Sequence, residues 1–320
     1  MPFPHVPHRF RRGQPAAVAM VAMAALASIL TVPARASTSL PVNYDFISGA
    51  LAGLNATTPP PGANNWSCQP TAAHPYPVIL VHGTFANMDD NWQAASPLLA
   101  NHGYCVYAFN YGGSSPTDDI QGTGDIAVGA GTLGSFVNQV LAVTGAPKVD
   151  LVGHSLGGMM PRYYINNLGG APKVNVFVSF SATNYGTTWG AIGDLASLLG
   201  VSIADQSSCV SCAQETQGSA FLAALNVTPT VPGPLYTAIG TRDDEIVTPY
   251  TDAFLPAAPN VANITVQDQC PLDASDHLEI AADPIALADM LNALDPSDPV
   301  RVPCLVVLAV TGPIGPVPSF

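Results

Sequence analysis

Residues 149–158 read VDLVGHSLGG, in which an apolar, β-branched run passes directly into the pattern Gly153-x-Ser155-x-Gly157. An apolar segment at residues 159–168 follows at once, so the order predicts a strand, a tight turn and a helix. Glycines on either side of the serine leave room for the strand and the helix to pass closely. We therefore expect the Ser155 hydroxyl to stand clear of a sheet as a nucleophile. The alternative is an ordinary glycine-rich turn.

The rest of the chain alternates short apolar runs with amphipathic segments, which predicts an α/β fold with a mostly parallel central sheet and helices on both faces. The expected domain is a single one over residues 37–320, with an insertion at about 183–234. Residues 37–66, rich in Ala, Asn, Thr and Pro, are expected to form an extended arm on the surface. The predicted strands cover residues 77–81, 104–109, 149–153, 174–178, 235–239 and 261–266, and the predicted helices cover residues 91–102, 125–143, 159–168 and 281–294.

The first 36 residues have the pattern of a signal peptide. Three arginines precede an apolar run over residues 16–32, and Ala34-Arg35-Ala36 places small residues at the two positions that a signal peptidase reads. We expect cleavage after Ala36 and secretion of the mature chain. A membrane anchor is the alternative, although the run is short for a spanning helix.

The charge of the mature chain excludes some partners. Residues 1–36 hold four of the nine basic residues and no acidic ones, so their removal changes the formal net charge from −13 to −17. A strongly acidic surface argues against binding to nucleic acid. Because only 10% of residues are charged and 48% are hydrophobic, the chain is expected to be a compact globule with a large core.

A serine nucleophile needs a base, and the base needs a group that holds its tautomer. In chains with this kind of turn the order is serine, acid, histidine. Only His277 follows Ser155 at any distance, which makes His277 the expected base. The acid should lie just past the end of a strand, and the run RDDEIV at residues 242–247 follows the strand at 235–239. Asp244 is the expected acid, with Asp243 and Glu245 as alternatives.

The negative charge on an attacked carbonyl needs hydrogen-bond donors. One expected donor is the amide of Leu156, at the start of the helix after the serine. The second should come from the loop after the first strand, and we expect it to be the amide of Thr84, assisted by its hydroxyl. His82, in the same loop, is interpreted as a structural residue.

All six cysteines lie beyond the signal segment, which in an exported chain predicts three disulfides. Fifteen pairings are compatible with the sequence. A zinc or redox role for Cys209-x-x-Cys212 is disfavoured, because no second Cys or His pair has metal-ligand spacing. No cofactor and no metal is expected.

At these motifs the chain resembles a known family. Residues 66–304 are similar to secreted α/β-hydrolase lipases of the actinobacterial class 2 group, and more distantly to the fungal lipase B type. The matching motifs are LVHGT at 80–84, GHSLGG at 153–158, DEIVTP at 244–249 and DH at 276–277. The resemblance supports Asp244 over its neighbours. It also implies the pairings Cys68 with Cys105, Cys209 with Cys212 and Cys270 with Cys304.

The resemblance implies hydrolysis of carboxylic esters through an acyl-enzyme. Export, few charges and the apolar residues of the insertion favour lipid or other hydrophobic esters, so we expect a triacylglycerol lipase or carboxylesterase that acts as a monomer and touches lipid–water interfaces transiently. The apolar segment at residues 189–201 is interpreted as a mobile amphipathic cover or as an ordinary packed helix. An acyltransferase of the same fold and a polyester-degrading esterase are the alternative functions.

Overall fold

The computed structural model describes residues 1–5, 39–202 and 208–319. The chain divides into two units, Met1–Thr38 and Ser39–Phe320, and the second unit holds all the elements described below. The predicted signal segment lies outside the described residues except for residues 1–5, and it stays a prediction.

The second unit is built on a six-stranded sheet in which every neighbouring pair is parallel, in the order β2-β1-β3-β4-β5-β6. The predicted parallel sheet is therefore confirmed. A short antiparallel pair, β7 and β8, lies near the carboxyl end of the chain. The strands are β1 Val78–Val81, β2 Val106–Ala108, β3 Val149–His154, β4 Val174–Phe180, β5 Leu235–Gly240, β6 Val261–Thr265, β7 Val307–Leu308 and β8 Gly312–Pro313.

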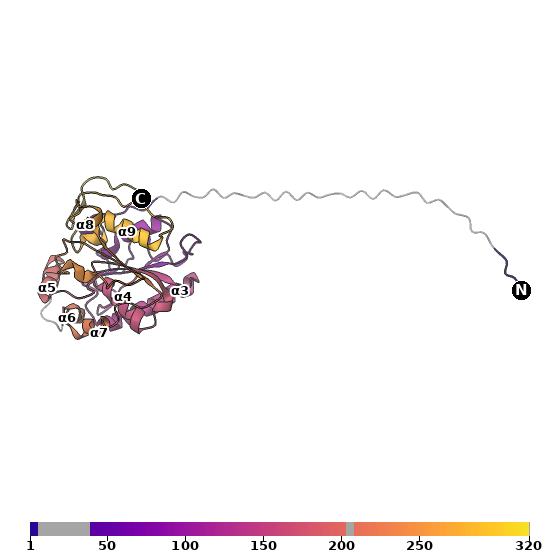
Figure 1. Cartoon of the computed structure of the whole chain (residues 1–320), viewed down its shortest axis with the longest axis horizontal. Helices are drawn as coiled ribbons and strands as arrows, with labels where there is room; N and C mark the ends of the chain where they lie inside the picture. Colours follow the sequence, from indigo (N-terminus) through magenta and orange to yellow (C-terminus); the bar gives the residue numbers. More distant parts are fainter. Residues whose placement is uncertain (6–38, 203–207, 320) are drawn as a thin grey trace. The chain divides into compact units, whose positions relative to one another are not determined.

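Helices cover both faces of this sheet, as predicted. Figure 1 shows α9 on one side of the strands and α3 and α4 on the other. The α-helices are α1 Phe46–Ala52, α2 Ala95–Asn101, α3 Ile126–Thr144, α4 Leu156–Asn167, α5 Trp189–Leu198, α6 Val210–Glu215, α7 Ala220–Leu225, α8 Val266–Gln269 and α9 Pro284–Leu294. Single 3-10 turns are η1 Asp90–Trp92, η2 Ala171–Lys173, η3 Tyr250–Ala253 and η4 Glu279–Ala281.

The continuous apolar runs of the central strands follow from this double cover. In β1 every side chain is buried: Val78 and Leu80 belong to the core under α9, and Ile79 and Val81 belong to the core under α3 and α4. Successive side chains of a strand point to opposite faces, so apolar residues at consecutive positions are typical of a strand such as β1 that is covered on both sides.

Helix α3 is long and apolar enough to cross a membrane by length and composition alone. One face of it, including Leu133 and Val137, packs in the core that it shares with α4. A helix with this pattern of burial serves as one layer of the fold.

The segment before β1 differs from the prediction of an extended arm. Residues 46–52 form α1, capped by the Asp45 carboxylate, which accepts a hydrogen bond from the Ser48 amide. The Phe46 side chain is buried, and its amide donates to Glu279 Oε2 over 3.0 Å. The helix is short and rich in Gly and Ala, so a distant partner holds it and local periodicity does not reveal it.

Two helix starts also differ from the prediction. The segment predicted as one helix at residues 91–102 is split into η1 and α2, with Pro97 in the first turn of α2. Proline has no amide hydrogen to donate, which suits it to a first turn and not to a helix interior. Helix α9 begins at Pro284, three residues later than predicted, because Asp283 caps the amides of Ile285 and Ala286.

The three disulfides match the pairing that the family resemblance implied. Cys68 is bonded to Cys105, Cys209 to Cys212, and Cys270 to Cys304. The last of these joins the loop before residue 277 to the carboxyl-terminal segment. The short Cys209–Cys212 link encloses few residues, so it restricts the unfolded chain less than the two long links do.

The pKa of Glu279 generates a prediction about stability. Burial disfavours the charged form and raises this pKa to about 9, assisted by Asp276, Asp45 and Asp273. The folded chain thus keeps a proton on Glu279 that an unfolded glutamate releases at a pKa of about 4.3. The contribution of this proton to folding stability is fully present below pH 4.3, and it is lost as the pH rises to 9. Between pH 6 and pH 9.5, we expect the wild-type Tm to fall by at least about 5 °C more than the Tm of Glu279→Gln.

The exposed Asp298→Asn variant is the control, and it should keep the wild-type dependence of Tm on pH. Parallel pH profiles for the wild type and Glu279→Gln would show that Glu279 holds no such proton.

Candidate active site

The candidate nucleophile lies at the bend between β3 and α4. Ser155 has φ 55° and ψ −121°, a left-handed backbone conformation that non-glycine residues rarely adopt. A Cβ on Gly153 would overlap the carbonyl oxygen of Gly157, and a Cβ on Gly157 would overlap the carbonyl oxygen of Val81. The two glycines let α4 start against the ends of β3 and β1, which projects Ser155 from the sheet as predicted.

Two distant loops bring the predicted base and acid to this serine. His277 lies between α8 and η4, and Asp244 lies just after β5. His277 Nε2 is 2.9 Å from Ser155 Oγ, and His277 Nδ1 is 3.0 and 3.1 Å from the two carboxylate oxygens of Asp244. The structure therefore brings together the three side chains expected from the sequence.

The alternative acids have other positions. Asp243 is exposed, and Glu245 is exposed but accepts a hydrogen bond from the His277 amide through its carboxylate over 3.2 Å. Asp244 is buried, and its Oδ1 also accepts from the amides of Ile246 and Val247. These bonds hold the carboxylate next to the His277 ring.

The electrostatics of the pair favour an imidazole that gains a proton easily. Burial alone would lower the pKa of His277, but the charge and hydrogen bond of Asp244 outweigh it and raise this pKa above 6.5. Burial likewise opposes ionisation of Asp244, and His277 outweighs it to lower the pKa of that carboxyl. At neutral pH the acid is ionised and faces a ring that can take up a proton at Nε2.

The two segments that carry the expected oxyanion donors lie next to Ser155. Leu156 is the first residue of α4, and a Cβ on Gly83 would lie 3.1 Å from the Ser155 Cβ, so the loop that carries Thr84 passes directly over the serine. The Thr84 hydroxyl was expected to assist its amide as an oxyanion donor. In the structure it instead donates to Glu215 Oε1 over 2.6 Å. Glu215, at the end of α6, is a neighbour that the sequence analysis did not identify.

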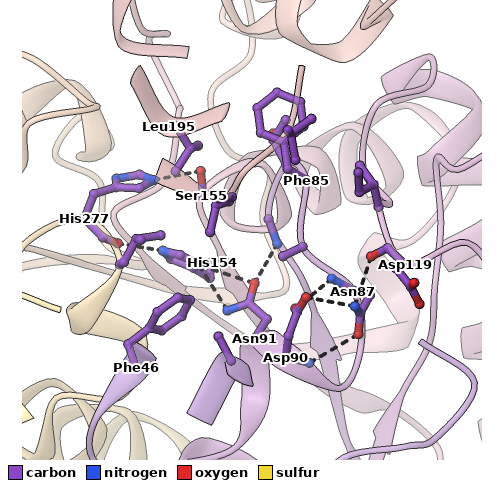
Figure 2. A pocket seen from close by; sticks show the side chains of 18 of the residues that line it. Phe46, Phe85, Asn87, Asp90, Asn91, Asp119, His154, Ser155, Leu195 and His277 are labelled. Atoms are coloured by element: carbon purple, nitrogen blue, oxygen red, sulfur yellow. Dashed lines mark hydrogen bonds between the residues drawn. The ribbon is translucent and has the colours of Figure 1, made fainter. Parts of the chain in front are cut away.

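A chain of buried hydrogen bonds, also not identified from the sequence, joins the loop of residue 83 to the loop of residue 277 (Figure 2). The Gly83 amide donates to Asn91 Oδ1 over 2.8 Å, which fixes the orientation of the Asn91 amide. Its Nδ2 therefore donates to His154 Nδ1 over 3.1 Å, and His154 Nε2 donates to the His277 carbonyl over 2.8 Å. Burial lowers the pKa of His154 to about 3, so the ring stays neutral and in this one tautomer.

His82 belongs to the same region without facing Ser155. Its ring stacks on Tyr111 with 4.3 Å between centroids, and burial lowers its pKa to about 4. The Tyr111 hydroxyl donates to the His82 carbonyl, which supports the interpretation of His82 as a structural residue.

A cavity of about 230 Å³ opens onto Ser155 and His277 (Figure 2). One wall comes from α1, through Phe46 and Ala50, and the opposite wall comes from Leu195 and Leu199 at α5. The apolar residues that line it are Phe46, Ala50, Leu54, Phe85, Ala86, Ile120, Leu195, Leu199, Val201 and Leu278, while Asn87, Asp90 and Asp119 form a polar end.

The Asn91 link generates a prediction about stability. Replacement of Asn91 by leucine keeps the volume but leaves the Gly83 amide and His154 Nδ1 buried without partners, so we expect the free energy of unfolding to fall by about 2–4 kcal/mol. Chemical denaturation measures this loss. Asn138→Leu, at an exposed position of α3, is the matched control and should change stability by no more than about 0.5 kcal/mol. Equal effects of the two substitutions would contradict the role given to Asn91.

Residues 75–286 match the family model described as "Lipase (class 2)". A curated triacylglycerol lipase of Pseudarthrobacter phenanthrenivorans is 45% identical over 97 residues, which are 29% of this chain and 28% of that protein. One of Burkholderia plantarii is 45% identical over 97 residues, which are 29% of this chain and 25% of that protein. The chain thus aligns with less than a third of the length of these relatives.

Among solved structures, lipase B of Aspergillus fumigatus is similar to this chain with a TM-score of 0.53 and 17% identity, over 75% of this chain and 56% of that one. At this identity the likeness concerns the fold alone, and it confirms the predicted α/β-hydrolase class. The family match covers the whole sheet and the loops of Thr84, Ser155, Asp244 and His277. The chain therefore belongs to the class 2 lipase family.

Proposed function

We propose that this chain hydrolyses carboxylic esters of lipids, as a triacylglycerol lipase or carboxylesterase, through Ser155, His277 and Asp244. The observation that carries the proposal is the continuous contact from Ser155 Oγ to His277 Nε2 and from His277 Nδ1 to the Asp244 carboxylate, at the base of an apolar cavity. A hydroxyl at hydrogen-bond distance from an oriented imidazole is the arrangement that activates a serine. The class 2 lipase match supports the same reaction.

In the proposed acylation step, Ser155 Oγ attacks the ester carbonyl carbon while His277 Nε2 takes its proton. The carbonyl oxygen becomes an anion and is held by the amides of Thr84 and Leu156. When the tetrahedral intermediate collapses, the bond to the alcohol oxygen breaks, and His277 returns the proton to that oxygen. The alcohol leaves, and an acyl ester remains on Ser155.

Deacylation repeats these steps with water as the nucleophile. His277 takes a proton from water, the hydroxide attacks the acyl carbon, and Ser155 leaves with the proton as the fatty acid forms. In both steps the imidazolium of His277 is stabilised by Asp244, the interaction that raises the pKa of His277 in the resting chain.

The walls of the cavity support a hydrophobic acyl group. Side chains from α1 and α5 face it from two sides, and Leu51 on α1 and Leu198 on α5 are more than half exposed, at 65% and 52%. Large exposed apolar side chains near a binding site are typical of contact with a hydrophobic surface. We infer that these leucines touch the lipid–water interface while the ester enters the cavity.

Secretion is part of the proposal. The basic and apolar segment in residues 1–36 supports export. The three disulfides support an oxidising compartment, since such bonds are rare in the cytosol.

A covalent probe tests the nucleophile. We expect a fluorophosphonate to label the peptide that contains Ser155, and Ser155→Ala to lose label and to lose kcat by about 10⁴ or more. Mass spectrometry of the digested protein locates the label, and Ser135→Ala, at an exposed serine of α3 outside the contact chain, controls for loss of any serine. Labelling of another residue, or turnover that persists in Ser155→Ala, would refute the proposal.

The interface contact predicts a difference between two substrates. Leu51→Asp places a charge on the inferred lipid contact, so hydrolysis of an emulsified triglyceride should fall at least about fivefold more than hydrolysis of a soluble short-chain ester. A pH-stat records both rates. Val227→Asp, on a loop after α7 with 81% exposure, is the matched control and should lower neither rate selectively. Equal losses on both substrates in Leu51→Asp would argue against an interface contact.

A further inference from the structure

Glu215 is a buried carboxyl group beside the oxyanion loop that the mechanism above does not use. Its side chain is 2% exposed, and its two oxygens accept hydrogen bonds from two threonine hydroxyls, Thr84 Oγ1 over 2.6 Å and Thr183 Oγ1 over 3.0 Å. Within the described residues it has no ion pair with a basic side chain. The donors that stabilise the charge of the buried Glu215 carboxylate, among the described residues, are therefore these two hydroxyl groups.

The Thr84 hydroxyl has one hydrogen, so it serves either Glu215 or the substrate. While Glu215 is ionised, both of its oxygens are acceptors only, and the Thr84 hydrogen is committed to Oε1. When Glu215 carries a proton on Oε1, the direction of this hydrogen bond reverses. Glu215 then donates to Thr84 Oγ1, and the hydroxyl hydrogen becomes free to point at an oxyanion on Ser155.

We propose that Glu215 is a positioning residue that sets the direction of the Thr84 hydroxyl, and that its protonated form adds a third donor to the oxyanion site. The inference rests on the proposed ester hydrolysis. No proton leaves the chain in this step: one hydroxyl rotates, one hydrogen bond to Glu215 reverses, and one hydrogen bond to the oxyanion forms.

The surroundings of Glu215 make the protonated form accessible near neutral pH. Burial raises the pKa of Glu215 to about 7, against the hydrogen bonds of Thr84 and Thr183, which lower it. The titratable groups that act on it among the described residues are His277, whose positive form lowers the pKa of Glu215, and Tyr111, whose own pKa lies well above 10. Tyr111 stays neutral. Among the described residues, His277 is therefore the group whose positive charge opposes the protonation of Glu215.

The decisive quantity is the ratio of kcat for Glu215→Gln to kcat for the wild type, measured on a soluble ester from pH 6 to pH 9. A glutamine at this position can donate to Thr84 at every pH, so the ratio should rise by about tenfold as the wild-type Glu215 ionises, a fraction of the effect of losing a full oxyanion donor. Both proteins titrate His277, and the Thr84→Val background below separates any effect of the Glu215 charge on that titration. A ratio that does not change with pH would overturn the inference.

The background variant Thr84→Val separates the hydroxyl from the charge of Glu215. In that background the same ratio should not rise with pH, since no hydroxyl remains to be turned. A rise of equal size there would assign the effect to the charge of Glu215 acting on His277, and it would overturn the inference.

Thr183→Val tests the inference without a change at Glu215 or Thr84, which keeps it testable if Glu215→Gln fails to fold. In the wild type, kcat should decrease as the pH rises and Glu215 ionises. Removal of the Thr183 hydrogen bond raises the pKa of Glu215 further, so in Thr183→Val this decrease should occur at higher pH. A decrease of kcat at the same pH in Thr183→Val and in the wild type would overturn the inference about Glu215. The kcat of the wild type also tests the proposed function directly. A wild-type chain that cleaves no ester would refute that function, and not only the inference about Glu215.

Discussion

The close passage of α4 over the ends of β3 and β1 is the constraint on which the rest of the site depends. Any side chain at Gly153 or Gly157 would collide with backbone carbonyl oxygens. At the bend between them, Ser155 adopts a left-handed backbone conformation that is strained for a non-glycine residue. That strain persists because the strands on either side are buried on both faces and cannot relax. The helix amide and the serine hydroxyl consequently point to the same space.

The parallel sheet explains why distant residues meet there. All six strands run in one direction, so the loops after β1, β3 and β5 lie at the same edge and bring Thr84, Ser155 and Asp244 together, and His277 follows in the loop after α8. Hydrogen bonds between loops then set their separation. Asn91 and His154 connect the first loop to the last, and Glu215 connects the first loop to the insertion between β4 and β5.

The sequence was sufficient for those parts of the site that depend on local patterns. The apolar run before Gly153, the order of serine, acid and histidine, and the strand before residue 240 predicted Ser155, His277 and Asp244 as neighbours. It was not sufficient for contacts made across the fold. Helix α1 depends on Glu279, which is 233 positions away from Phe46, and Asn91 reaches His154 over 63 positions. No periodicity or spacing encodes such pairs, because they exist only after the sheet has formed.

In the proposed reaction, Ser155 attacks a carbonyl whose oxygen then lies between the amides of Thr84 and Leu156. A crystal structure of the chain after reaction with an alkyl phosphonate, a mimic of the tetrahedral intermediate, tests it most directly. We expect phosphorus bonded to Ser155 Oγ, the phosphoryl oxygen within about 3 Å of both amides, and the alkyl group between α1 and α5. A phosphoryl oxygen turned away from these amides, or an alkyl group outside the cavity, would refute the proposed reaction.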